Sequence, residues 1–107
     1  MNISLEYLYR DAGNNKIWGE VIFGNRNSIE TSLLNNEIQN YLIDGEFFNA
    51  DKISLPSLGF ENFDRELDHG WHEYFTVNNS EGLPNDFHGR DISEFIHTLK
   101  IAGFPKL

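Results

Sequence analysis

Histidine and carboxylate side chains are concentrated in one stretch of the chain, residues 64–73. This stretch reads Asp-Arg-Glu-Leu-Asp-His-Gly-Trp-His-Glu and holds two histidines and four carboxylates. Imidazole and carboxylate groups bind divalent metals, so His69 and His72 are candidate metal ligands. Their spacing matches no established metal signature, and the His-Glu-x-x-His pattern of zinc proteases is absent. The favoured alternative is a polar strand entry whose histidines hydrogen-bond to neighbouring carboxylates.

The same stretch has residue types that suit acid–base chemistry. Asp68 beside His69, with Glu73 nearby, could act as a general acid–base pair. Catalysis also needs a nucleophile or a substrate held in a pocket, and the sequence indicates neither. The chain has no cysteine, no Gly-x-Ser-x-Gly elbow and no dinucleotide-binding fingerprint. We therefore predict no catalytic residues, no cofactor and no enzymatic activity.

A second group of polar residues surrounds the first predicted turn. Arg10 and Lys16, with the backbone N–H groups of residues 13–15, could hold a phosphate or a carboxylate. The favoured alternative is an ordinary hairpin turn in which Arg10 and Asp11 neutralise each other. Arg10 and Lys16, together with the two histidines of 64–73, carry the alternative functional hypothesis: a small-molecule- or metal-binding protein, or a small enzyme.

Two strands are predicted ahead of any helix. Residues 2–10 alternate between apolar and polar types, and β-branched and aromatic residues dominate 17–23, which together predict an antiparallel hairpin. Leu8 interrupts the polar side of the first strand, so both faces are expected to be partly covered. If the second strand turns its β-branched side toward the helices, Trp18 and Ile22 lie on the open face. Exposed aromatic residues on a flat face are typical of protein interfaces, although a loop could cover them instead.

Two helices are predicted from the spacing of apolar residues and from their end signals. The first spans 28–43, opened by a capping box of Asn27 and Glu30 and closed by Gly45 in a left-handed conformation. A second capping box, at 91–94, opens the last helix of the chain. Each box satisfies backbone N–H groups that a helix start leaves without partners.

Two further strands are predicted between the helices. Residues 46–55 form the third, and a slip in their alternation predicts a β-bulge near Asp51. Residues 71–77 form the fourth. One of its faces is predicted to carry Trp71, Phe75 and Val77, and the other His72, Tyr74 and Thr76. Residues 56–70, between these strands, are either a loop or a short helical turn.

The order β-β-α-β-β-α predicts an α+β fold. Its simplest packing is a four-stranded, mainly antiparallel sheet with two helices packed on one face. A chain of 107 residues is expected to form one domain, 1–107. Apolar runs are too short to span a bilayer, and the first ten residues do not resemble a signal peptide. We therefore predict a cytoplasmic location.

Charge narrows the classes of partner. The formal net charge is −9, and residues 27–94 hold fourteen acidic side chains against three basic ones, which gives −11. Residues 1–26 balance, with three of each sign. Nucleic-acid binding needs clustered Lys and Arg, so direct binding to DNA or RNA is not expected, nor is attachment to an anionic membrane. An acidic region of this kind suits a basic protein partner.

Several segments of the chain resemble those of a group of small, uncharacterised bacterial proteins. The resemblance is carried by residues 9–14 (Tyr-Arg-Asp-Ala-Gly-Asn), 18–23 (Trp-Gly-Glu-Val-Ile-Phe), 42–48 (Leu-Ile-Asp-Gly-Glu-Phe-Phe) and 68–73 (Asp-His-Gly-Trp-His-Glu). It implies a stand-alone bacterial protein, and it implies no activity, cofactor or site residue.

The leading functional hypothesis is a non-catalytic binding protein with an acidic, aromatic-containing surface. In a bacterium this would be an immunity or inhibitor protein that neutralises a basic toxin or nuclease, since electrostatic steering makes such inhibition fast. The predicted contact residues are Glu61, Asp64, Glu66, Asp68, Trp71 and Glu73. A third hypothesis is a homodimer formed through the open face of the sheet.

Overall fold

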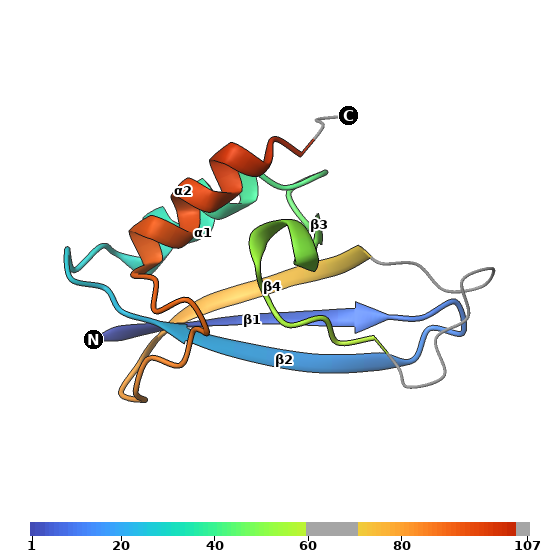
Figure 1. Cartoon of the computed structure of the whole chain (residues 1–107), viewed down its shortest axis with the longest axis horizontal. Helices are drawn as coiled ribbons and strands as arrows, with labels where there is room; N and C mark the ends of the chain where they lie inside the picture. The colour runs from blue at the N-terminus through green and yellow to red at the C-terminus, as the bar shows by residue number, and fades with distance from the viewer. Residues whose placement is uncertain (60–70, 105–107) are drawn as a thin grey trace.

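The computed structural model describes residues 1–59 and 71–104 (Figure 1). Its elements in chain order are β1 (Asn2–Arg10), β2 (Lys16–Phe23), α1 (Thr31–Asn40), β3 (Phe47–Asn49), the 3-10 helix η1 (Ala50–Ile53), β4 (Trp71–Ser80) and α2 (Ile92–Ala102).

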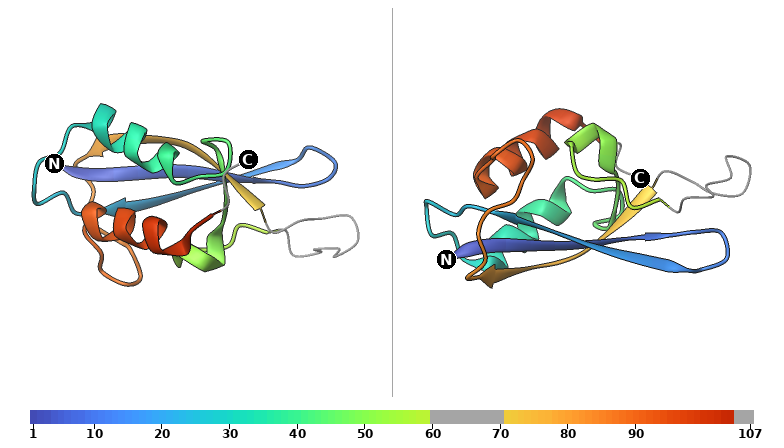
Figure 2. Two further views of the ribbon diagram at one scale, coloured as in Figure 1. Left: turned by 90° about the horizontal axis from the view of Figure 1, so that it is seen from above. Right: turned by 60° about the horizontal axis from the view of Figure 1, so that its bottom comes forward.

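The described strands form one four-stranded sheet in the order β2-β1-β4-β3, and every neighbouring pair is antiparallel. Helices α1 and α2 both lie on one face of this sheet, as Figures 1 and 2 show from three sides. The apolar core fills the layer between them and is built from both helices, η1 and the inward side chains of the strands. The predicted α+β fold is therefore confirmed, and neither α1 nor α2 covers the other face of the sheet.

Strand β4 contains a β-bulge that the alternation pattern did not predict. Glu6 of β1 pairs with Thr76, whereas the next residue, Tyr7, pairs with Tyr74. Phe75 is therefore an extra residue on β4, with no counterpart on β1. An extra residue reverses the side to which all later side chains of the strand point.

The bulge changes which side chains of β4 face the helices. Three of them are buried in the core: His72, Tyr74 and Val77. Trp71 and Phe75 are exposed on the opposite face. The prediction that Val77 shares a face with Trp71 and Phe75 is wrong, because strict alternation holds only up to the bulge.

The third strand is shorter than predicted, and its bulge near Asp51 does not exist. β3 ends at Asn49, whose side-chain oxygen accepts a hydrogen bond from the Asp51 N–H at 3.0 Å and so caps η1. Ala50 and Ile53 are one turn apart and both buried. The slip in alternation over 46–55 is therefore the signature of a helical turn.

Helix α1 begins at Thr31, and the predicted capping box of Asn27 and Glu30 is wrong. Glu30 is the N-cap residue, and its side chain makes no capping hydrogen bond. Asn25 binds both backbone groups of Ile29 instead, at 3.1 Å to the N–H and 3.0 Å to the C=O. This closed turn delays the helix start. Gly45 has a positive φ of 69° as predicted, but in the turn before β3, several residues beyond the end of α1 at Asn40.

Helix α2 has the predicted capping box. The Asp91 side chain accepts from the helix N-terminus, and Glu94 accepts from the Asp91 N–H at 3.1 Å. Gly103 closes the helix in a left-handed conformation. The Ile92 N–H donates to the Gly24 carbonyl at 2.8 Å, which ties the start of the helix to the end of β2.

A largely buried ion pair connects the loop before α2 to the core. The Arg90 and Asp86 side chains are 9% and 2% exposed, and Nε and Oδ2 lie 2.8 Å apart. The Arg90 guanidinium also donates to the carbonyls of Ile53 and Ser54, and it lies over the ring of Phe95. Burial alone would raise the pKa of Asp86, but the hydrogen bonds from Arg90 outweigh it and lower that pKa below its ordinary value.

Replacing Arg90 by alanine should therefore destabilise the fold strongly. Arg90→Ala leaves the Asp86 carboxylate buried without its cation, which typically costs about 3 kcal/mol or more. The exposed cation of Arg26, which pairs with Glu94 at 2.6 Å, offers a matched control: Arg26→Ala should cost less than about 1 kcal/mol. Urea denaturation measures both free energies of unfolding, and equal costs would contradict a structural role of the Arg90 pair.

Candidate functional site

The candidate site is the face of the sheet that the helices leave uncovered. Strand β1 runs through its middle, and the residues opposite one another in the strand pairing share this face. From β1 it carries Ser4, Glu6, Leu8 and Arg10; from β2, Lys16, Trp18, Glu20 and Ile22; from β4, Trp71, Glu73, Phe75, Thr76 and Asn78. We call this surface the open face.

An aromatic pair stands near the middle of the open face. Trp18 and Phe75 are 53% and 57% exposed, and their ring centroids lie 5.1 Å apart in an edge-to-face arrangement. Leu8 pairs with Trp18 across the strands and is buried, although neither α1 nor α2 lies on this side. Together with the aromatic pair, Leu8 gives this face a small apolar centre of its own.

An ion pair with a second carboxylate lies beside this apolar centre. Arg10 donates to Glu73 through Nε at 2.8 Å and through Nη2 at 3.3 Å, and it also binds Asn14 at 2.6 Å. Burial, a hydrogen bond with Glu73 and the negative charge of Glu73 raise the pKa of Glu46, and the positive charge of Arg10 opposes that shift. Glu46, Glu73 and Arg10 thus form one electrostatic group.

Two further carboxylates flank the open face and are held in place by neutral partners. Glu20 accepts a hydrogen bond from the Ser4 hydroxyl at 2.7 Å, and Glu6 accepts one from the Asn78 side chain at 3.1 Å. Because these donors carry no charge, the two hydrogen bonds do not neutralise either carboxylate. The open face is therefore apolar in its centre and charged around it, with the carboxylates of Glu6, Glu20 and Glu73 against the basic side chains of Arg10 and Lys16.

His72 lies on the other side of the sheet, inside the core. It is 1% exposed, its Nε2 accepts a hydrogen bond from the Leu58 N–H at 3.0 Å, and the rings of Tyr7, Tyr9 and Phe48 lie within 6.0 Å of its own. Arg10 and Lys16 lie on the open face. The structure therefore does not bring His72 together with these two basic residues.

Four of the six predicted partner-binding residues, Glu61, Asp64, Glu66 and Asp68, lie outside the described residues, as does His69. Of the other two, Trp71 is exposed and Glu73 is bound to Arg10, both on the open face. Arg10, predicted to pair with Asp11, thus forms its ion pair with Glu73. Asp11 accepts hydrogen bonds from Asn15 instead, at 2.8 and 3.1 Å.

Comparisons with protein families, with curated proteins and with solved structures found no match to this chain. The resemblance to a group of bacterial proteins therefore stays a prediction. Within residues 1–59 and 71–104, no three His, Asp or Glu side chains are grouped so that they could hold a metal. None of the described helices is long and apolar enough to cross a membrane.

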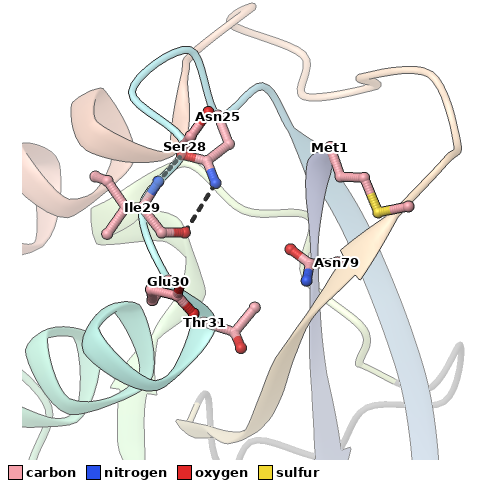
Figure 3. A pocket seen from close by; sticks show the side chains of 7 residues that line it. All are labelled: Met1, Asn25, Ser28, Ile29, Glu30, Thr31 and Asn79. Atoms are coloured by element: carbon pink, nitrogen blue, oxygen red, sulfur yellow. Dashed lines mark hydrogen bonds between the residues drawn. The ribbon is translucent and has the colours of Figure 1, made fainter.

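A shallow hollow of about 230 Å³ lies between the start of α1 and the ends of β1 and β4 (Figure 3). It is lined by Met1, Asn25, Ser28, Ile29, Glu30, Thr31 and Asn79. Glu30 is the only charged side chain among them, and the Asn25 amide is occupied by Ile29. The hollow therefore gathers no set of groups suited to catalysis.

The sequence pattern identified one half of the aromatic pair and missed the other. Trp18 was predicted on the open face from strand alternation, and the structure places it there. Phe75 was also assigned to the side opposite Tyr74, but together with the core residue Val77, so its exposure could not be recognised. The exposure of Phe75 follows from the bulge in β4. The bulge is defined by the pairing of β4 with β1, which the sequence pattern of β4 alone does not contain.

Glu46 should make the protein less stable at neutral pH than at pH values where this carboxyl is protonated. A raised folded-state pKa means that its stabilising contribution is present below the ordinary pKa and is lost as pH rises through the folded value. Glu46→Gln should therefore raise stability at pH 7, by no more than about 0.5 kcal/mol because the side chain is exposed. The gain should disappear near pH 4.

Urea denaturation at both pH values measures this difference. Glu37→Gln, on the exposed side of α1, removes one carboxylate far from Glu73 and serves as the control. If Glu46→Gln lowers stability at pH 7, Glu46 instead stabilises the fold through Arg10, and burial and the negative charge of Glu73 are not the dominant effects.

Proposed function

We propose that this chain is a non-catalytic binding protein that uses the open face of its sheet to hold a basic protein partner. The observation that carries the proposal is the exposed pair of Trp18 and Phe75 on a sheet face without helical cover. Antiparallel sheets with one solvated face usually carry polar side chains there. Large aromatic side chains at such a position are typical of interface centres.

Charge around the aromatic pair supports a basic partner. Glu6 and Glu20 lie beside it, and Glu46 lies near the Arg10–Glu73 pair. Carboxylates at the rim of an interface speed association with a basic protein and discriminate against acidic ones. An aromatic anchor surrounded by such a rim combines slow dissociation with fast association.

The proposal keeps the predicted contact residues Glu61, Asp64, Glu66 and Asp68 on grounds of charge and sequence position alone. In the sequence they precede Trp71, the first residue of β4, and they carry four carboxylates. The concrete form of the proposal is a cytoplasmic bacterial immunity or inhibitor protein that neutralises a basic toxin or nuclease.

The alternative function, a small-molecule or metal site using His69, His72, Arg10 and Lys16, gains no support from the described geometry. His72 faces the core, and Arg10 and Lys16 lie on the opposite side of the sheet. A ligand could not contact all three side chains at once.

Removing the aromatic pair should weaken partner binding while leaving the fold intact. Trp18→Ala combined with Phe75→Ala removes the proposed anchor and should lower affinity by about 2 kcal/mol or more, roughly 30-fold. Partners are captured from a lysate of the native host on the wild-type chain, and calorimetry then measures the affinity of each purified partner. Thermal melting confirms that the variant is folded.

The helical side of the molecule offers a matched control. Leu33 of α1 and Ile101 of α2 are 60% and 71% exposed, slightly more than the aromatic pair, and lie on the helices that cover the other face of the sheet. Leu33→Ala combined with Ile101→Ala should leave the affinity unchanged. If this control weakens binding and the Trp18/Phe75 variant does not, the proposed binding surface is wrong.

Reversing the predicted acidic contacts should slow association with a basic partner. Changing Asp64, Glu66 and Asp68 to lysine should reduce the association rate at low salt, and the effect should shrink at high salt. The control changes Glu30, Glu37 and Asp51 to lysine, which alters the net charge equally at exposed sites on the helical side. Equal behaviour of the two variants, or unchanged affinity at both salt concentrations, would contradict the electrostatic version.

A further inference from the structure

Strand β2 forms one edge of the sheet, and its outer side is covered at one end only. The Ile22 N–H donates to the Asn85 side-chain oxygen at 2.8 Å, and the Ile22 carbonyl accepts from the Asn85 N–H at 2.9 Å. The Gly24 carbonyl, two residues further on, accepts from the Ile92 N–H. Ile22 and Gly24 therefore turn their backbone groups away from β1.

Lys16, Trp18 and Glu20 occupy the other alternate positions of β2, six, four and two residues before Ile22. The β1–β2 pairing runs without a register shift, so their N–H and C=O groups also point outward. Within residues 1–59 and 71–104, none of these groups has a hydrogen-bond partner. The free edge is bounded by the turn at residues 11–15 on one side and by Asn85 on the other.

We propose that this free edge pairs with the same edge of a second copy of the chain. The two β2 strands would run antiparallel about a two-fold axis, with Trp18 opposite Trp18 of the second copy. Lys16 would then lie opposite Glu20 of the second copy, and Glu20 opposite its Lys16. Every outward N–H and C=O group of the three residues would be paired across the axis.

Charge complementarity favours this register, and it favours a second copy of the chain as the partner. Shifting the pairing by two residues one way leaves Glu20 opposite the turn, and shifting it the other way sets Lys16 against Ile22, whose groups Asn85 already occupies. Only the register with Trp18 opposite Trp18 places opposite charges face to face on both sides of the axis. The sequence Lys-x-Trp-x-Glu is therefore complementary to itself when antiparallel.

The resulting dimer would join two sheets edge to edge, with the helices of both copies on the same face of the joined sheet. The open faces of the two copies would form one continuous surface, with the Trp18 side chains on either side of the axis and each Phe75 beside its own Trp18. This arrangement goes beyond the proposed partner binding and does not depend on it. It also differs from a dimer through the open face, which would bury Trp18 and Phe75 and leave the edge of β2 free.

Sedimentation equilibrium of the full chain from about 1 µM to about 1 mM tests the dimer, since pairing of two copies depends on concentration. The wild type should form a dimer within this range. Lys16→Glu and Glu20→Lys should each weaken it at least about tenfold, because each places like charges opposite one another. The double variant Lys16→Glu/Glu20→Lys should restore it, since opposite charges again face each other.

Two further variants separate edge pairing from other modes of association. Glu20→Pro removes an outward N–H that the monomer does not use, so it should weaken the dimer more than Glu20→Ala while both variants remain folded by circular dichroism. Phe75→Ala should leave the dimer unchanged. A monomer over the whole range, single charge reversals without effect, or a dimer lost in Phe75→Ala alone would overturn the proposal. Because the readout is oligomeric state, it is independent of any test of partner binding.

Discussion

The extra residue in β4 is the constraint on which both sides of the sheet depend. Before Phe75, the buried positions of β4 are His72 and Tyr74; after it, the buried position is Val77. Without the bulge, one of these two sets would face solvent, since the period of a strand is two residues. The bulge lets a ten-residue strand bury side chains on the core side both before and after Phe75. It also leaves Phe75 on the open face, where the ring meets Trp18.

The core side of the sheet shows how polar groups are accommodated once this register is fixed. His72 is surrounded by aromatic rings, and its Nε2 is satisfied by the Leu58 N–H, so the imidazole stabilises the chain that leaves η1. Leu58 in turn packs over Gly19, where a Cβ atom would come within 2.8 Å of its side chain. The loop after η1 therefore requires both a histidine and a glycine beneath it. His72 is therefore a structural residue that holds Leu58 in place. This role explains why His72, a candidate metal ligand by residue type, lies in the core of the described structure.

Features decided by near neighbours could be predicted from the sequence, and features decided by distant contacts could not. The hairpin of β1 and β2 and the capping box of α2 depend on alternation or on residues three positions apart. The predicted start of α1 was wrong because Asn25 binds the backbone of Ile29. The predicted third strand was too long because Asn49 caps a helical turn. The bulge and the Arg90 contacts with Ile53 and Ser54 connect residues far apart in the chain. Of the site, Trp18 followed from alternation alone, while its neighbour Phe75 needed the register with β1.

The distribution of charge allows self-association and partner binding to coexist. A net charge of −9 on every copy opposes pairing of like molecules, and salt screens such repulsion over about 8–10 Å. The first 26 residues, which include β1 and β2, carry equal numbers of acidic and basic side chains. The excess acid lies in residues 27–94, beyond the β2 strand. The edge proposed to meet a second copy thus belongs to the balanced part of the sequence. The acidic remainder is free to attract a basic partner, so most of the charge that attracts this partner lies outside the edge that pairs with a second copy.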